Sequence, residues 1–324
     1  FAVLPSNLGM IPLFLNGLPL GMVWGLVFGY LEGRRVSEAL GAGLSASYIV
    51  ASMAVKSVGG WLMLDHGVSE QWMPAFTGLL FAPVLFLSVW GLSQLPPPSA
   101  EDRAARTQRR PMDRAARREF VARFTPGLLA LTALYVLLTA YRDFRDNFAR
   151  ELWDALGFAG EPEIMTYVEI YVAFGVLLSL AMIMRVKDNA RAVWVVHAVM
   201  LAGSVLIGSS TWAFDAGLIE PMTWMGCVGL GLYLGYVPFG CVLFDRLIAA
   251  VGFVGTAGFM IYVTDAFGYL GSVSLLLYKN FGEPDLSWLD FFRGFSYVTA
   301  LLCSAAFVFS MLYFARVMKT EVSA

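Results

Sequence analysis

The sequence predicts an all-α protein, a bundle of helices that crosses a membrane several times. Two observations indicate this fold class. Of its 324 residues, 58% are apolar and only 14% are charged, which is about half the charge of an average soluble domain. Predominantly apolar stretches of about 20 residues also recur along the chain, and a helix of that length crosses a hydrocarbon core about 30 Å thick. Because lipid offers a free backbone amide no hydrogen-bond partner, such segments must be helical.

Nine of these apolar stretches follow one another, and we predict one transmembrane helix in each. They cover residues 9–31, 38–62, 73–95, 125–148, 164–185, 191–213, 221–244, 254–279 and 291–316. Strands of a transmembrane β-barrel would instead show alternating polar and apolar residues in runs of about ten.

The basic residues indicate the orientation of the spans, because Lys and Arg in short loops stay on the cytoplasmic side. They gather in alternate loops and at the C-terminus, and the intervening loops are mostly acidic. The basic set comprises Arg34, Arg35, the 96–124 segment, Arg185, Lys187, Arg191, Arg246, Arg316 and Lys319. We therefore predict a multi-pass membrane protein with a cytoplasmic C-terminus.

A long polar segment, residues 96–124, divides the chain. It opens with Pro96, Pro97 and Pro98 and contains eight arginines. We predict a cytoplasmic linker with an amphipathic piece that touches anionic lipid headgroups, and no nucleic-acid binding. The division gives a partial N-terminal bundle of three spans (1–95), the Arg-rich linker (96–124) and a C-terminal six-helix bundle (125–324).

A weak internal repeat agrees with halves of six helices. The first span contains Leu20–Trp24 (LGMVW) and the seventh contains Leu234–Pro238 (LGYVP), six spans later and facing the same way. Parallel repeats of six helices produce this relation.

This organisation resembles the major facilitator superfamily. The phrases at Leu15–Gly25, Tyr141–Phe148 and Gly229–Phe239 are similar to those of an uncharacterised bacterial family of facilitator-like membrane proteins. The resemblance implies that the chain holds spans four to twelve of twelve, without the first three. It also implies a location in the bacterial cytoplasmic (inner) membrane.

Glycines recur every four residues in the first span, which places them along one helix face. They are Gly17, Gly21, Gly25, Gly29 and Gly33. Small residues at this spacing let a neighbouring helix approach closely, so we expect a helix-packing ridge. The alternative is that the ridge lets a gating helix bend or slide.

Charges at the external end of the fourth span are the strongest functional signal. Arg142, Arg145 and Asp146 continue an apolar helix, and charges near lipid are costly unless they pair or face water. One interpretation is a mutually paired cluster at the external interface. The other is a cavity lining that binds solute or forms an external gate. Resemblance to organophosphate antiporters, which place an arginine and a following aspartate in this helix, favours an anionic solute.

Single ionisable residues in other spans extend the candidate set. Asp265 and Glu169 are candidates for proton coupling, and Lys56 is a candidate partner for an anion or a carboxylate. Asp265 could instead form a buried ion pair that fixes helix register, and Lys56 could instead extend its ammonium to the membrane surface. Tyr233 and Tyr236 lie in a glycine-rich span that resembles a cavity-lining helix of the superfamily, so they are candidate solute contacts.

These features favour a secondary active transporter of a small polar, anionic solute, working by alternating access and driven by protons. The alternative is a membrane receptor, scaffold or regulatory protein that has a facilitator-like fold but does not transport. The sequence contains no phosphate loop, zinc-ligand spacing or nucleophile elbow. We therefore expect no enzymatic activity, no metal and no cofactor. The expected partners are the lipid bilayer and a small-molecule solute, with the protein acting as a monomer.

Overall fold

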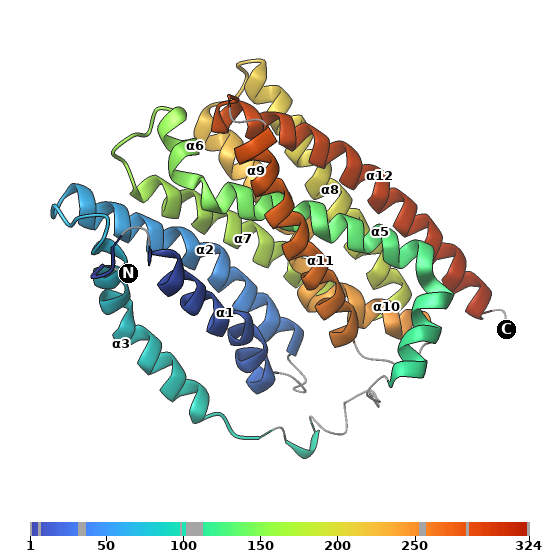
Figure 1. Ribbon diagram of the computed structural model, residues 1–324. Helices are drawn as coiled ribbons and strands as arrows, with labels where there is room; N and C mark the ends of the chain where they lie inside the picture. Colours follow the sequence, from blue (N-terminus) through green and yellow to red (C-terminus); the bar gives the residue numbers. More distant parts are fainter. Residues whose placement is uncertain are drawn as a thin grey trace.

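The computed structural model describes residues 2–5, 8–31, 37–97, 99–101, 113–252, 257–282 and 285–322, and within these ranges it contains helices and no strands (Figure 1). The α-helices are α1 (Met10–Leu31), α2 (Ser37–Leu64), α3 (Met73–Ser93), α5 (Arg114–Asn147), α6 (Ala149–Ala155), α7 (Glu163–Met184), α8 (Asn189–Asp215), α9 (Pro221–Pro238), α10 (Phe244–Ala250), α11 (Ala257–Leu277) and α12 (Trp288–Val322). Two π-helical segments, η2 (Phe239–Leu243) and η3 (Tyr278–Gly282), follow α9 and α11. The all-helical prediction is confirmed.

Eight helices in the described part of the chain are long and apolar enough to cross a membrane. They match eight of the nine predicted spans and are consistent with a multi-pass membrane protein. The first predicted span, 9–31, coincides with α1, which contains no charged residue. Several side chains of α1 lie outside the described residues, and α1 is not among the eight.

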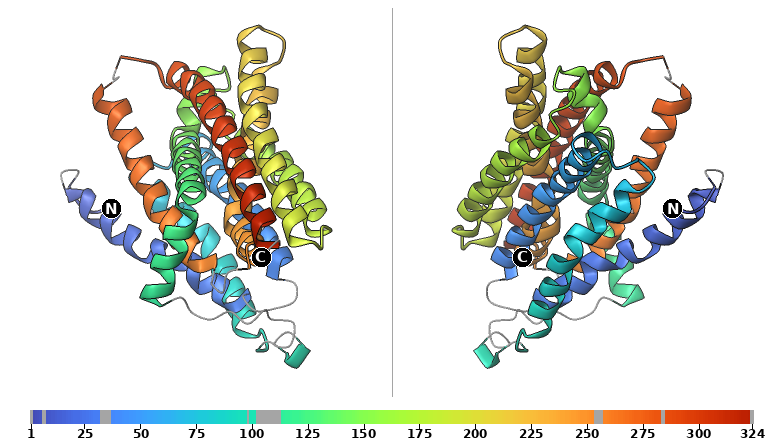
Figure 2. Two further views of the ribbon diagram at one scale, coloured as in Figure 1. Left: turned by 90° about the vertical axis from the view of Figure 1, so that its right-hand side faces the viewer. Right: turned by 90° about the vertical axis from the view of Figure 1, so that its left-hand side faces the viewer.

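The helices from α5 onward form one bundle. α5 packs against α11, α12 and α9, while α8 packs against α9 and α12. α2 lies against α7 on the side of this bundle, and α1 and α3 contact α2. In Figure 1, α3 lies at the edge of the molecule, away from α8 and α12. Figure 2 places the α8–α9 hairpin at one end and the first turns of α5 at the other.

α5 is longer than its apolar stretch predicts. It begins at Arg114, where the Asp113 side chain accepts a hydrogen bond from the Ala116 N–H, an ordinary N-cap. The helix bends at Phe124 (φ −114°, ψ 15°), two residues before Pro126, because proline lacks the N–H that would continue the ladder. Part of the predicted linker is therefore helical, whereas residues 102–112 lie outside the described ones.

Small residues bring α8 and α9 together. A Cβ atom on Gly203 would stand 2.5 Å from the Gly231 carbonyl oxygen, and a Cβ atom on Gly231 would stand 2.5 Å from the Gly203 carbonyl oxygen. No side chain fits in that space. The two helix backbones consequently touch, as small-residue helix interfaces allow.

The glycine ridge predicted in the first span behaves differently at Gly17. Among the residues that the structure describes, a Cβ atom there would meet nothing within 4 Å, so no close approach of a neighbouring helix is seen at this position. The described part of α1 lies against α2. The surroundings of Gly21, Gly25 and Gly29, and Gly33 itself, lie outside the described residues.

Candidate functional site

The last two turns of α5 carry the charged residues that the sequence singled out. α5 carries no charged residue from Thr125 to Tyr141, and the buried ring of Tyr141 stacks on Phe292 of α12. This packing fixes the rotation of α5 within the bundle. The charges that follow therefore point in set directions toward neighbouring helices, and they divide into two groups.

The first group begins at Arg142. Its guanidinium donates two hydrogen bonds to Asp143 Oδ1, from Nε at 2.9 Å and from Nη2 at 2.6 Å. Nη1 donates to the hydroxyl of Tyr236 on α9, and the guanidinium carbon lies 4.7 Å from the centre of the Tyr236 ring. The arginine is thus held by a carboxylate and by a cation–π contact.

The group continues across the bundle to α11. The hydroxyls of Tyr236 and Tyr135 are 2.9 Å apart and their rings are stacked, and the Tyr135 hydroxyl donates to Asp265 Oδ1. A continuous polar chain therefore links Arg142 on α5 to Asp265 on α11 through two tyrosines. We call these residues, with Asp143, the tyrosine network.

The second group is a buried ion pair. Arg145 Nη2 donates to Glu169 Oε1 of α7 at 2.5 Å and to the carbonyl oxygen of Met225 on α9 at 3.2 Å. Both charged side chains are almost completely buried, at 1% and 2% exposure. Gly229 makes room for the guanidinium, since a Cβ atom at this position would lie 2.7 Å from Arg145 Nη2.

Lys56 connects α2 to the same region. Its ammonium donates to the backbone carbonyl oxygen of Asp146, in the last turn of α5. That carbonyl oxygen also accepts from the N–H of the C-cap residue Phe148, and a cation at a helix C-terminus is favoured by the helix dipole. A carboxylate or an anion was predicted as the partner of Lys56, whereas its hydrogen bond goes to a main-chain oxygen.

Several polar atoms around the ion pair are buried without a hydrogen-bond partner. They are Arg145 Nε and Nη1, Asp146 Oδ1 and Glu169 Oε2, and Arg145 Nη1 lies 4.0 Å from Asp146 Oδ1. Buried polar groups are nearly always hydrogen-bonded to protein or water. Arg145, Asp146 and Glu169 therefore form a buried charged cluster whose side chains use only part of their hydrogen-bonding capacity on protein groups.

Sequence reasoning found most of these residues but not their partners. Arg142 and Arg145 both reach α9, at Tyr236 and at the Met225 carbonyl oxygen, but Arg142 pairs with Asp143 of its own helix whereas Arg145 pairs with Glu169 of α7. Tyr233 is buried and packs edge to face against Tyr48 of α2, with ring centres 6.4 Å apart. Tyr48 was missed, although it lies about two turns before Lys56.

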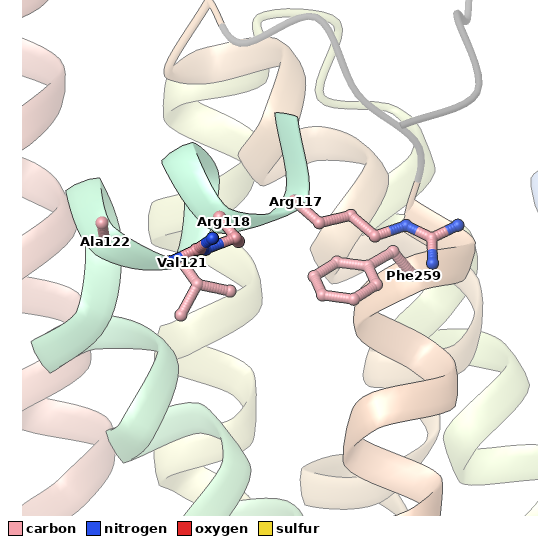
Figure 3. A pocket seen from close by; sticks show the side chains of 5 residues that line it. All are labelled: Arg117, Arg118, Val121, Ala122 and Phe259. Carbon is pink, nitrogen blue, oxygen red and sulfur yellow. The ribbon is translucent and has the colours of Figure 1, made fainter. Parts of the chain in front are cut away.

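A pocket of about 360 Å³ lies elsewhere, where α5 begins. Arg117, Arg118, Val121 and Ala122 of α5 line it together with Phe259 of α11 (Figure 3). At a rise of about 1.5 Å per residue, it is roughly 35 Å along α5 from Arg142. The tyrosine network and this pocket are separate features. No group of three or more His, Cys, Asp or Glu residues that could hold a metal occurs among the residues the structure describes.

Fold and composition define a class: an all-helical protein with several helices suited to crossing a membrane and with ion pairs inside the bundle. Within that class, the chain belongs to the family of unknown function DUF5690, whose model matches residues 1–317. Searches among curated proteins and among solved structures found no match.

Proposed function

We propose that this protein is a secondary active transporter that moves a small polar solute with an anionic group by alternating access, driven by protons. The observation that carries the proposal is the tyrosine network. An arginine, two tyrosines and an aspartate join three membrane helices, at a depth where polar groups are expensive and generally functional.

Arg142 is the proposed solute-binding residue. Its side chain is 17% exposed and that of Asp143 is 18% exposed, so the guanidinium is reachable, unlike that of Arg145 at 1%. A guanidinium suits a carboxylate or phosphate because its donors bind two oxygens at once. A solute anion would compete with Asp143 and Tyr236 for the same donors.

Asp265 is the proposed proton carrier. It accepts a hydrogen bond from Tyr135, which is linked through Tyr236 to Arg142. A solute that draws Arg142 away from Tyr236 would change the hydrogen bonding of both tyrosines, and hence the stabilisation of the Asp265 carboxylate. Solute binding and protonation would thereby be coupled across the bundle.

The ion pair and Lys56 support an external gate. Lys56 ties α2 to the end of α5, and Arg145 ties α5 to α7. Opening a path between these helices would require the bond from Lys56 to be released. The pairing of Glu169 with Arg145 supports including Glu169 in this gate.

The helix arrangement supports the facilitator-type fold that the sequence resembles. α2 packs on α7 from outside the bundle that runs from α5 to α12. Two groups of helices that meet along one surface can rock against each other, as alternating access requires.

Flux measurements test the proposal. Purified protein in liposomes should accumulate at least one solute from a panel of carboxylates and organophosphates when a proton gradient is imposed. Arg142→Gln should abolish uptake and counterflow, whereas Asp265→Asn should abolish proton-driven uptake but leave counterflow. Arg150→Gln, in the exposed Arg150–Asp154 pair of α6, is the matched control and should transport normally.

Unchanged flux in Arg142→Gln would remove the tyrosine network from transport. Absence of flux for every solute, in protein that elutes as a folded species, would refute the transporter and favour a receptor or scaffold.

A further inference from the structure

The pocket at the start of α5 is not used by the proposed transport mechanism. It lies between the first three turns of α5 and the first turn of α11 (Figure 3). Arg117 extends over Phe259, with the guanidinium carbon 5.4 Å from the ring centre. Two arginines therefore border a pocket whose remaining lining is apolar: Val121, Ala122 and Phe259.

Along this face of α5, basic residues come before apolar ones. Arg114, Arg117, Arg118, Val121 and Ala122 recur at three- and four-residue steps, so they share one helix face. The arginines come first and the apolar residues one turn later. Glu119 is turned about 200° from Arg117 and lies on the opposite side of the helix. The face thus has a cationic end and an apolar end.

The bend in α5 at Phe124 separates this face from the charge-free part of the helix. After Phe124 the helix carries no charged residue until Arg142, so the hydrocarbon-crossing part begins at the bend. The arginines precede it by one to three turns, at the level where lipid headgroups lie. Val121 is 41% exposed and lies between the arginines and the bend.

From this geometry we propose that the pocket binds the headgroup of an anionic phospholipid. The phosphodiester is held by Arg117 and Arg118, and the glycerol end of the acyl chains rests on Val121, Ala122 and Phe259. Basic pockets between helices near the membrane surface suit anionic headgroups, and the apolar floor suits a lipid better than free phosphate. A zwitterionic lipid lacks the net charge that two arginines select.

The test measures lipid binding to the purified, delipidated protein in detergent, by native mass spectrometry and by thermal unfolding. Phosphatidylglycerol, phosphatidylcholine and inorganic phosphate are the three probes. Phosphatidylglycerol should bind and raise the unfolding temperature, and the other two should do neither. Arg117→Gln with Arg118→Gln should weaken phosphatidylglycerol binding about 30-fold.

Two further variants keep the result interpretable. Phe259→Leu retains the apolar floor and removes the ring beneath Arg117, so binding should weaken by a smaller factor. Arg150→Gln, an exposed arginine of α6, should bind as the unmodified protein does. The proposal is overturned if the double variant binds phosphatidylglycerol as tightly as Arg150→Gln does, if phosphatidylcholine binds equally well, or if inorganic phosphate alone gives the full stabilisation.

Discussion

At the scale of single residues, Arg145 is the buried charge whose stability depends most on its partner. Its side chain is 1% exposed, its closest carboxylate is that of Glu169, and its other hydrogen bond goes to the Met225 carbonyl oxygen; Asp146 Oδ1 lies farther away, 4.0 Å from Nη1. Removing one member of a buried pair leaves the other charge uncompensated, which costs about 3–5 kcal/mol. Glu169→Gln should therefore lower the free energy of unfolding by about that amount, measured by denaturant titration in detergent.

The matched control is an ion pair at the surface. Arg150 and Asp154 lie 3.8 Å apart with side chains 55% and 44% exposed, and such pairs contribute less than about 1 kcal/mol. Asp154→Asn should leave stability nearly unchanged. Equal losses in Glu169→Gln and Asp154→Asn would contradict the assignment of Arg145 as a buried, dependent charge.

Gly229 is predicted to be required for the position of Arg145. A Cβ atom there would lie 2.7 Å from Arg145 Nη2, whereas at Gly226, one turn earlier on α9, the nearest atom would be Val168 Cγ1 at 3.7 Å. Overpacking costs about 1–3 kcal/mol. Gly229→Ala should lower the unfolding temperature and Gly226→Ala should not. Equal unfolding temperatures for the two variants would show that the Arg145 guanidinium can shift to another position without loss of stability.

The sequence could identify these charged residues but not pair them. A charge within an apolar stretch is visible in a hydropathy profile, which is why Arg142, Arg145, Asp265 and Glu169 were all found. The partner is chosen by how α7, α9 and α11 are arranged around α5, and that is a property of tertiary packing. Gly229 matters because it lacks a side chain, so no chemical signal marks it.

At the scale of elements, the contact between α8 and α9 depends on two glycines. Gly231→Ala would put a methyl group against the Gly203 carbonyl oxygen, 2.5 Å away, and the helices would have to separate. We expect a loss of about 1–3 kcal/mol, read as a lower unfolding temperature. Gly78→Ala in α3, where nothing lies within 4 Å, is the control and should melt as the unmodified protein does.

The helices themselves follow closely from hydropathy, because an apolar stretch of membrane-crossing length has one available backbone structure. α3 was predicted at 73–95 and spans Met73–Ser93; α7 was predicted at 164–185 and spans Glu163–Met184. An amphipathic piece was predicted within 96–124, but not its continuity with the fourth span in α5, because its arginines lower hydropathy without disfavouring a helix. The π-helical turn after α9 was also missed, since it reflects local packing near Pro238.

At the scale of the whole molecule, the charge asymmetry predicts which loops share a side. Cysteine introduced at Lys187, between α7 and α8, should be protected from a membrane-impermeant maleimide in intact cells. Cysteine introduced at Glu161, between α6 and α7, should be labelled. The background would carry alanine at the three native cysteines, Cys227, Cys241 and Cys303.

If the cysteine at position 187 is labelled and the one at position 161 is protected, the predicted orientation is inverted. If both are labelled, the predicted alternation of loops between the two sides of the membrane is wrong. The division of the chain into 1–95, 96–124 and 125–324 is tested by the same approach, because a cytoplasmic linker requires cysteines at positions such as Ser99 to be protected too.

The hydrogen bond from Lys56 to the Asp146 carbonyl joins positions 90 residues apart, and this separation bears on biosynthesis. When α2 leaves the ribosome, α5 has not been made, so Lys56 must enter the lipid phase without its acceptor. The insertion cost of a lysine reaches about 2.5–3.5 kcal/mol at the centre of a membrane helix and is smaller toward its ends; Lys56 lies in the second half of α2. Retention of α2 in the insertion channel until α5 is synthesised would avoid this cost. The stability of α2 in the bilayer therefore depends in part on a helix that is synthesised later.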